Sequence, residues 1–272
     1  EDILHFDNNN ILEIAKTRQT PFYLYSENII KNNYNSYSES FGDHSHNICY
    51  SVKANSNLSI LKIFNSLGSG FDIVSEGELD RIIKVGADPK KVVFSGVAKS
   101  DLEITKALEF GICFFNVESF DELLAINRIS EKFGTSARVS IRVNPDIDPK
   151  THPYISTGLK TSKFGIAIED SLDAYIEASK MKNIKVVGID AHIGSQIFDL
   201  QPFEDSLVRL ENLYYKLNDL GINIEYIDIG GGLGIKYKDN DAPPTKADFA
   251  SKIIKIMNCL LYTSDAADEL RS

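Results

Sequence analysis

The sequence Tyr50-Ser51-Val52-Lys53-Ala54-Asn55 ends an apolar run with a lysine and continues into a polar turn. The alternation of Tyr50 and Val52 with smaller residues is typical of a β-strand, and the Asn-Ser-Asn that follows is typical of a turn. Lys53 is therefore expected at the end of a strand. A lysine there is either a solvated charge or a buried amine, in which desolvation disfavours the ammonium form and leaves a nucleophile able to form a Schiff base.

Apolar, mostly β-branched runs recur along the chain and alternate with helical patterns. The seven strand candidates end near Lys53, Ser75, Gly96, Glu118, Asn144, Gly194 and Gly230. Between them, apolar residues recur every three or four positions, which is typical of amphipathic helices. This alternation predicts an α/β protein with a parallel sheet covered by helices, and about eight repeats predict a (β/α)8 TIM barrel rather than an open sheet. The 272 residues suit such a barrel, which needs roughly 250.

The two ends of the chain depart from this repeat. Residues 1–21 contain a short helical pattern and precede an extended Phe22–Tyr25, so we expect a lead-in helix and strand before the barrel. The barrel itself is expected over residues 22–260, with its last helix ending near Leu260. No eighth strand follows that helix, and the polar residues 261–272 do not resemble a barrel strand. We interpret residues 261–272 as a non-native tail.

The composition argues against several functions. The net charge of −10 and the pI near 5.0 disfavour a nucleic-acid partner, because phosphate binding needs a basic face. No apolar run approaches the roughly 18 residues of a membrane span, and the acidic, polar start shows no secretory signal. The first residue is not methionine, which leaves open a missing N-terminal piece. Cys49, Cys113 and Cys259 are too far apart for a disulfide framework or a metal site, so we expect reduced thiols in a cytoplasmic protein and no metal.

A glycine-rich turn follows the seventh strand candidate. Gly230, Gly231 and Gly232 are consecutive, so their backbone N–H groups can surround a phosphate without obstruction by side chains. The alternative is an ordinary sharp turn between a strand and a helix. An amine that can form an imine and a turn that can hold a phosphate are together what pyridoxal phosphate requires.

Other polar side chains lie in or directly after apolar strand candidates. His192 ends the sixth strand, where it is either a packed structural residue or a stacked or acid–base group, and the Ser195 hydroxyl is placed to bond a phosphate or to begin a turn. Asp72 and Arg142 lie within strands, where an isolated charge is costly. We expect them to pair with each other or with Lys53, either as a structural network or in direct catalytic work.

An insert interrupts the repeat between the fifth and sixth strands. Residues 145–165 are rich in Pro, Asp, Thr and Lys, and inserts at the C-terminal end of a barrel commonly build the site. Asn144, before the insert, and Lys163, within it, supply polar groups to the same opening. We expect both to bind substrate, with Lys163 attracting a carboxylate unless it is merely solvated.

Four motifs together resemble a known family. They are Tyr50-Ser51-Val52-Lys53-Ala54-Asn55, Thr161-Ser162-Lys163-Phe164-Gly165, His192-Ile193-Gly194-Ser195-Gln196 and Ile227-Asp228-Ile229-Gly230-Gly231-Gly232-Leu233-Gly234. In this order they resemble the fold-type III pyridoxal-phosphate decarboxylases, whose barrel is of the alanine-racemase type, and most closely the diaminopimelate decarboxylases. The resemblance runs from about Phe22 to Cys259.

The resemblance implies roles for the residues already named. Lys53 would form the Schiff base with the cofactor, and His192 would stack on its pyridine ring. The phosphate would be held by Ser195 and the glycines 230–232, while Asp72 and Arg142 would organise the lysine side of the ring. The implied reaction converts meso-2,6-diaminopimelate to L-lysine and CO2, the last step of lysine biosynthesis, in a homodimer that shares its active sites.

Parts of the family pattern are not found in these 272 residues. Family members continue with an eighth strand bearing Glu-Pro-Gly-Arg and with a C-terminal β domain, to which residues 1–21 would also belong. The chain is therefore expected to be a truncated form that is unstable and nearly inactive alone. Three alternatives stay open: a relative acting on ornithine, arginine or carboxynorspermidine, a non-catalytic barrel that binds or regulates, and a Schiff-base aldolase.

Overall fold

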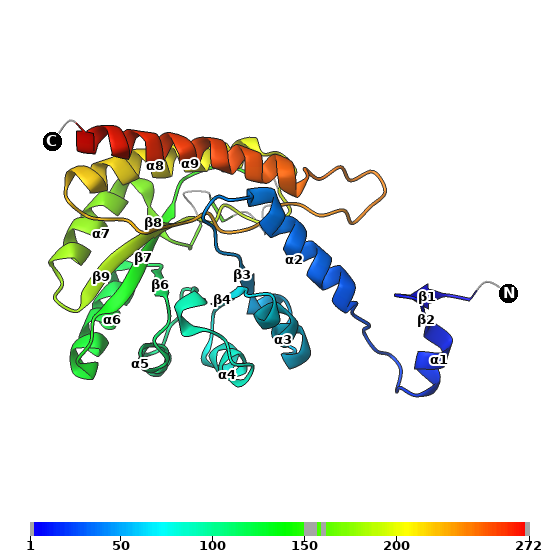
Figure 1. The fold of residues 1–272 in the computed structure, drawn as a ribbon. Helices are drawn as coiled ribbons and strands as arrows, with labels where there is room; N and C mark the ends of the chain where they lie inside the picture. The colour runs from blue at the N-terminus through cyan, green and yellow to red at the C-terminus, as the bar shows by residue number, and fades with distance from the viewer. Residues whose placement is uncertain (1–2, 150–156, 159–161, 270–272) are drawn as a thin grey trace.

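The computed structural model describes residues 3–149, 157–158 and 162–269 (Figure 1). Within these residues, seven parallel strands form one curled sheet in the order β10-β9-β7-β6-β5-β4-β3. Their bounds are β3 Cys49–Ser51, β4 Gly70–Ile73, β5 Val92–Phe94, β6 Phe114–Val117, β7 Ala137–Asn144, β9 Ile184–Asp190 and β10 Tyr226–Asp228. The predicted seven strands and their parallel arrangement are confirmed.

Helices follow the strands and cover the outer face of the curled sheet (Figure 1). Their bounds are α1 Ile11–Lys16, α2 Glu27–Phe41, α3 Leu58–Ser66, α4 Glu76–Lys84, α5 Asp101–Phe110, α6 Phe120–Phe133, α7 Ile168–Lys180, α8 Gln201–Asp219 and α9 Lys246–Glu269, with short 3-10 turns η1 Val52–Ala54 and η2 Pro89–Lys91. A two-residue strand, β8 Ile166–Ala167, pairs only with β7. No helix among the described residues is long and apolar enough to cross a membrane.

Local sequence signals explain where many of these helices begin. The side chains of Ser26, Asn57, Ser75, Ser100 and Ser119 each accept a hydrogen bond from a backbone N–H of the following helix. Such N-caps satisfy groups that have no partner within the helix. At α5 the cap is reciprocal, because Glu103 also bonds the backbone N–H of Ser100.

Two predictions about the ends of the chain are wrong. Residues 22–26 form no strand, and the side chain of Tyr23 is 90% exposed. An extended segment becomes a strand only where a neighbouring edge accepts its hydrogen bonds, and here the N-terminal hairpin (β1 His5–Phe6, β2 Asn9–Asn10) and α1 stand away from the sheet (Figure 1). The last helix does not end near Leu260, since α9 continues to Glu269.

The helical layer closes on itself although the sheet does not. Strands β3 and β10 are the two ends of the sheet order, whereas α9 packs against both α8 and α2. Phe249 of α9 is 3% exposed, and its ring lies 5.0 Å from that of Phe203 and 6.1 Å from that of Tyr37, measured between centroids. Contact between the first barrel helix and the last therefore depends on aromatic packing around Phe249.

We expect Phe249→Ala to destabilise the fold by about 3–5 kcal/mol, because it leaves a cavity among the rings of Phe203, Tyr37 and Phe41. Urea unfolding would measure the change. Phe133→Ala is a matched control, since the Phe133 side chain is 44% exposed at the end of α6. This substitution should lower the free energy of unfolding much less. Equal losses for the two variants would contradict a special role for the α2–α9 contact.

The interior of the curled sheet changes character along the strands. Near their N-terminal ends it is apolar, with Val93, Phe114 and Val187 in one buried cluster. Toward their C-terminal ends the side chains become polar, and Asn116 of β6 donates to Asp228 of β10 at 3.2 Å. The polar end of the sheet is therefore where ionisable side chains of different strands come together.

Candidate active site

Lys53 lies in the 3-10 turn η1, directly after β3, and its side chain is exposed. The neighbouring Val52 is fully buried and anchors the turn. Among the described residues, Lys53 makes no ion pair. Of the two alternatives from the sequence, the structure has the solvated amine, which leaves this nitrogen accessible at the C-terminal ends of the strands.

Asp72 lies on β4 beside this turn, with one oxygen bonded and the other not. Its Oδ2 accepts from the Ser51 hydroxyl at 2.9 Å, while its Oδ1 is buried without a partner among the described residues. Burial raises the pKa of Asp72, and the nearby charge of Lys53 acts in the opposite direction. A buried carboxylate oxygen without a donor is a place where a bound group could supply one.

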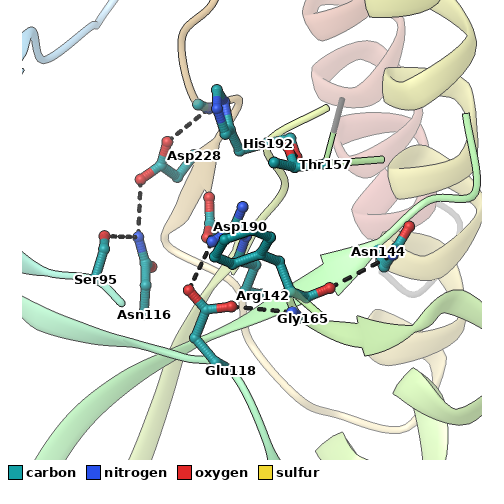
Figure 2. Close-up of polar contacts among 12 residues, drawn as sticks. Ser95, Asn116, Glu118, Arg142, Asn144, Thr157, Gly165, Asp190, His192 and Asp228 are labelled. Carbon is teal, nitrogen blue, oxygen red and sulfur yellow. Dashed lines mark hydrogen bonds and ion pairs between the residues drawn. The ribbon is translucent and has the colours of Figure 1, made fainter. Parts of the chain in front are cut away.

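Arg142 does not pair with Asp72, so the first of the two expected pairings is wrong. Its Nη1 donates to Glu118 Oε1 at 2.6 Å, and its Nε lies 3.9 Å from Asp190 Oδ2 (Figure 2). The strand order explains the difference, because β7 lies between β6 and β9, which carry Glu118 and Asp190 at their ends, whereas β4 is further along the sheet. Burial, together with the negative charge of Asp228, raises the pKa of Asp190 well above its usual value.

The end of the insert is attached to the same group of charges. Glu118 Oε2 accepts from the N–H of Gly165 at 2.9 Å, and Asn144 Nδ2 donates to the carbonyl of Phe164 at 3.4 Å (Figure 2). The Lys163 side chain is exposed, with its Nζ 5.3 Å from the centre of the Phe164 ring. Of the predicted substrate residues, Asn144 is thus buried in this cluster and Lys163 faces solvent; residues 150–156 and 159–161 of the insert lie outside the described residues.

His192 follows β9 and contacts the glycine turn. Its Nδ1 accepts from the N–H of Gly231 at 3.3 Å, and the N–H of Gly230 donates to Asp228 Oδ1 at 2.8 Å. Burial lowers the pKa of His192 from 6.5 to about 4, and the positive charges of Arg142 and Lys53 act in the same direction. The imidazole is therefore neutral at pH 7.

This shift makes the stability of the fold depend on pH. Between about pH 6.5 and pH 4 the unfolded chain binds a proton at His192 and the folded chain does not, so stability is expected to fall as the pH decreases through this interval. Urea unfolding at several pH values would measure this. The free energy of unfolding should change less with pH in His192→Gln than in the unchanged protein. His44→Gln, at an exposed position, is the control, and a slope unchanged by His192→Gln would contradict the prediction.

The glycine turn runs beside the segment that carries Ser195. A Cβ on Gly232, where φ is +104°, would lie 2.0 Å from the carbonyl oxygen of Gly194, whereas a Cβ on Gly231 would meet nothing within 4 Å. Ile197 exchanges backbone hydrogen bonds with this turn, which keeps the two loops parallel. Ser195 and Gly231 are both exposed on these adjoining loops.

The N–H groups of the turn are only partly as expected. The N–H of Gly230 donates to Asp228 and that of Gly231 donates to His192, so neither of these two groups is free for an anion. The backbone of the turn nevertheless lies close to the imidazole, since a Cβ on Gly230 would lie 2.8 Å from His192 Nδ1. The turn therefore helps to set the position of the imidazole.

Sequence reasoning missed four residues of this site, namely Asn116, Glu118, Asp190 and Asp228. All of them lie in or directly after apolar strands, at the polar end of the sheet. The rule applied to Asp72 and Arg142, that a polar side chain in an apolar strand is costly, would also have identified these four. Among the described residues, no group of three or more His, Cys, Asp or Glu side chains could hold a metal ion.

Residues 27–267 match the family model described as the pyridoxal-binding domain of pyridoxal-dependent decarboxylases. The chain belongs to this family. The cofactor of such a domain is pyridoxal phosphate, and the residues present fit it. Lys53 is an accessible primary amine, Asp72 Oδ1 is buried without a donor, and the turn 230–232 excludes side chains where it approaches the imidazole.

Curated relatives of this pyridoxal-binding domain are diaminopimelate decarboxylases. The one from Haemophilus influenzae is 46% identical over 252 residues, which are 93% of this chain and 60% of the relative. The one from Pseudomonas aeruginosa is 48% identical over 240 residues, 88% of this chain and 58% of the relative. The chain thus spans about 60% of the length of the curated relatives it matches.

Solved structures give the same result. Diaminopimelate decarboxylase from Helicobacter pylori, in complex with L-lysine, superposes with a TM-score of 0.89 at 44% identity, covering 92% of this chain and 63% of that one. The M. jannaschii enzyme, also with L-lysine, has a TM-score of 0.89 at 39% identity, covering 96% and 62%. The predicted fold class is therefore confirmed as a TIM-barrel-like domain whose described strands form a curled, open sheet.

Proposed function

We propose that the protein carrying this domain decarboxylates meso-2,6-diaminopimelate to L-lysine and CO2 with pyridoxal phosphate. The observation that carries the proposal is that an accessible lysine, a neutral imidazole and a glycine turn meet at one end of the sheet, in a chain 46–48% identical to diaminopimelate decarboxylases. The relatives solved with L-lysine support an amino-acid ligand for this opening.

Each residue has a task in this proposal. When bound, pyridoxal phosphate supplies a ring that accepts the electrons of the bond to the departing carboxylate. Lys53 would hold the cofactor through its amine, and His192 would offer a flat, uncharged ring, because its pKa of about 4 keeps it neutral at pH 7. Ser195 would donate its hydroxyl to the phosphate, and the turn 230–232 would let the phosphate approach the backbone, although the N–H groups of Gly230 and Gly231 already donate to Asp228 and His192.

Proton transfer also falls to residues of this chain. Lys53, once displaced from the cofactor by the amine of the substrate, would lie beside the reacting Cα and would move a proton to or from that atom. Asp72 lies near Lys53 and is held by Ser51, and Arg142 carries its positive charge near His192 and is held by Glu118. Lys163, exposed at the rim, would meet a substrate carboxylate, and Asn144 would fix the base of the insert that carries Lys163.

The substrate is tested by release of labelled CO2. The whole protein is incubated with carboxyl-labelled meso-diaminopimelate, ornithine or arginine under identical conditions. We expect release from diaminopimelate to exceed that from the other two by at least about a hundredfold, since a site built for a second carboxylate rejects substrates that lack it and leave its polar groups unpaired. Preference for ornithine or arginine would replace the proposed substrate, and no release from any of them would favour a non-catalytic domain.

We also infer a cytoplasmic homodimer, which the family resemblance implies. Sedimentation equilibrium of the whole protein at micromolar concentration should give twice the mass of one chain. A monomer that is fully active would overturn the part of the proposal in which two chains share their active sites.

A further inference from the structure

We propose that Glu118 is a positioning residue that fastens the end of the 145–165 insert to Arg142. Each of its carboxylate oxygens serves a different element. Oε1 accepts from Arg142 of β7 at 2.6 Å, and Oε2 accepts from the N–H of Gly165, just before β8, at 2.9 Å (Figure 2). The side chain is only 2% exposed, so both bonds are shielded from water.

Glu118 is itself held in place from behind. Its backbone N–H donates to Glu122 Oε2 at 3.0 Å, and Glu122 Oε1 accepts from Lys99 at 2.6 Å. The Lys99 side chain is 1% exposed and also donates to the carbonyl of Asn116, on the strand that leads to Glu118. This buried support fixes where the Glu118 carboxylate points before any ligand arrives.

The insert meets Arg142 on a second side. The guanidinium carbon of Arg142 lies 4.9 Å from the centre of the Phe164 ring, an arrangement typical of a cation–π contact. Gly165 follows with φ of +71°, and a Cβ there would lie 2.9 Å from the carbonyl oxygen of Arg142. The backbone at the end of the insert therefore lies in close contact with β7, and Glu118 hydrogen-bonds to both the insert and β7.

The arrangement gives Glu118 a function beyond folding. Lys163 precedes the two residues that contact Arg142, so the position of Gly165 determines where the insert leaves the sheet and where Lys163 stands. Arg142 in turn faces Asp190 and lies near His192, whose pKa it helps to lower after burial. Loss of the bridge is expected to loosen the substrate side of the opening while the Lys53 side, on β3 and β4, stays intact.

Glu118→Gln separates the two bonds. An amide has a single acceptor oxygen, so it cannot serve both the guanidinium and the Gly165 N–H, and its NH2 group would face one of these donors. Since the guanidinium is charged, it retains the oxygen and Gly165 loses its acceptor. Hydrogen exchange of the Gly165 amide in the whole protein is expected to become about tenfold faster or more, whereas the amides of β4 stay protected.

Glu225→Gln is the matched control. Glu225 is also an ion-paired glutamate, 2.8 Å from Arg138 and 2.7 Å from Lys185, but it precedes β10 at the opposite end of the strands. Exchange at Gly165 should be unchanged in this variant. If Glu118→Gln does not fold, Glu118→Asp keeps the charge beside Arg142 on a side chain that is one methylene shorter, so it cannot reach both donors and still deprives Gly165 of its acceptor.

The kinetic readout rests on the proposed function. Glu118→Gln is expected to raise KM for the diamino acid about tenfold and to change kcat less than threefold, because Arg142 keeps its acceptor at position 118 and Lys53 and Asp72 are not contacted by the changed side chain. Unchanged exchange at Gly165 in a folded Glu118→Gln protein would overturn the inference, as would an equal effect of Glu225→Gln. A different outcome is faster exchange at Gly165 in Glu118→Gln together with no decarboxylation by the unchanged protein. That outcome would support the bridge and refute the proposed function.

Discussion

Lys53→Ala eliminates the covalent adduct that borohydride forms between pyridoxal phosphate and the unchanged protein. This is the expected result because the Lys53 amine is exposed at the end of β3, and reduction of a Schiff base fixes the cofactor to the nitrogen that bears it. Decarboxylation by the variant is expected to fall by at least about a thousandfold, since it loses both the attachment point and a group that moves protons. Mass spectrometry of the peptide that spans residues 50–57 would locate the adduct.

Lys163→Ala provides the comparison for this experiment. The Lys163 side chain is likewise exposed, but it lies on the insert beside Phe164. We expect the adduct to form on Lys53 in this variant as in the unchanged protein. An adduct that survives Lys53→Ala and disappears in Lys163→Ala would place the imine on the insert and refute the proposed site.

The second large effect is expected from Gly232→Ala. The new methyl group would lie 2.0 Å from the carbonyl oxygen of Gly194, and a φ of +104° is a conformation that alanine rarely adopts. The turn must therefore move away from the segment 194–197, at a cost of about 1–3 kcal/mol for the backbone strain alone. Thermal unfolding should shift to lower temperature, and the affinity for pyridoxal phosphate should fall at least about tenfold.

Gly231→Ala is the control, one residue away in the same turn. A Cβ at this position meets nothing within 4 Å, so neither clash nor loss of the neighbouring loop is expected. Fluorescence titration with pyridoxal phosphate would compare the two variants directly. Similar affinities for both would mean that the close approach of Gly232 to Gly194 does not shape the binding site.

Several parts of the site could be predicted from the sequence alone. Lys53, His192 and the turn 230–232 each follow an apolar run, and in a parallel β/α fold the ends of such runs gather at one edge of the sheet. That rule needs only local periodicity and the direction of the chain. It placed these residues after β3, β9 and β10, at the C-terminal ends of the strands, without any knowledge of the strand order.

The partners of the charged residues could not be predicted in this way. Arg142 was expected to pair with Asp72 or with Lys53, yet it bonds Glu118 and lies near Asp190. Those partners are 24 and 48 positions away in the sequence, and only the register of β6, β7 and β9 brings them together. The free N–H groups expected at Gly230 and Gly231 are likewise engaged, by Asp228 two residues earlier in the chain and by His192, which follows the neighbouring strand β9.

By itself, the sequence determined the alternation of strands and helices, the end of the sheet at which the reactive groups lie, and the family to which they are similar. Those properties depend on residue spacing within one segment, where the periods of helix and strand are fixed by local geometry. The tertiary structure alone decided that Glu118 bridges Arg142 and the insert, and that Phe249 joins α9 to α2. These contacts depend on sheet curvature and helix packing, because side chains from distant segments meet only after the segments have been arranged in space.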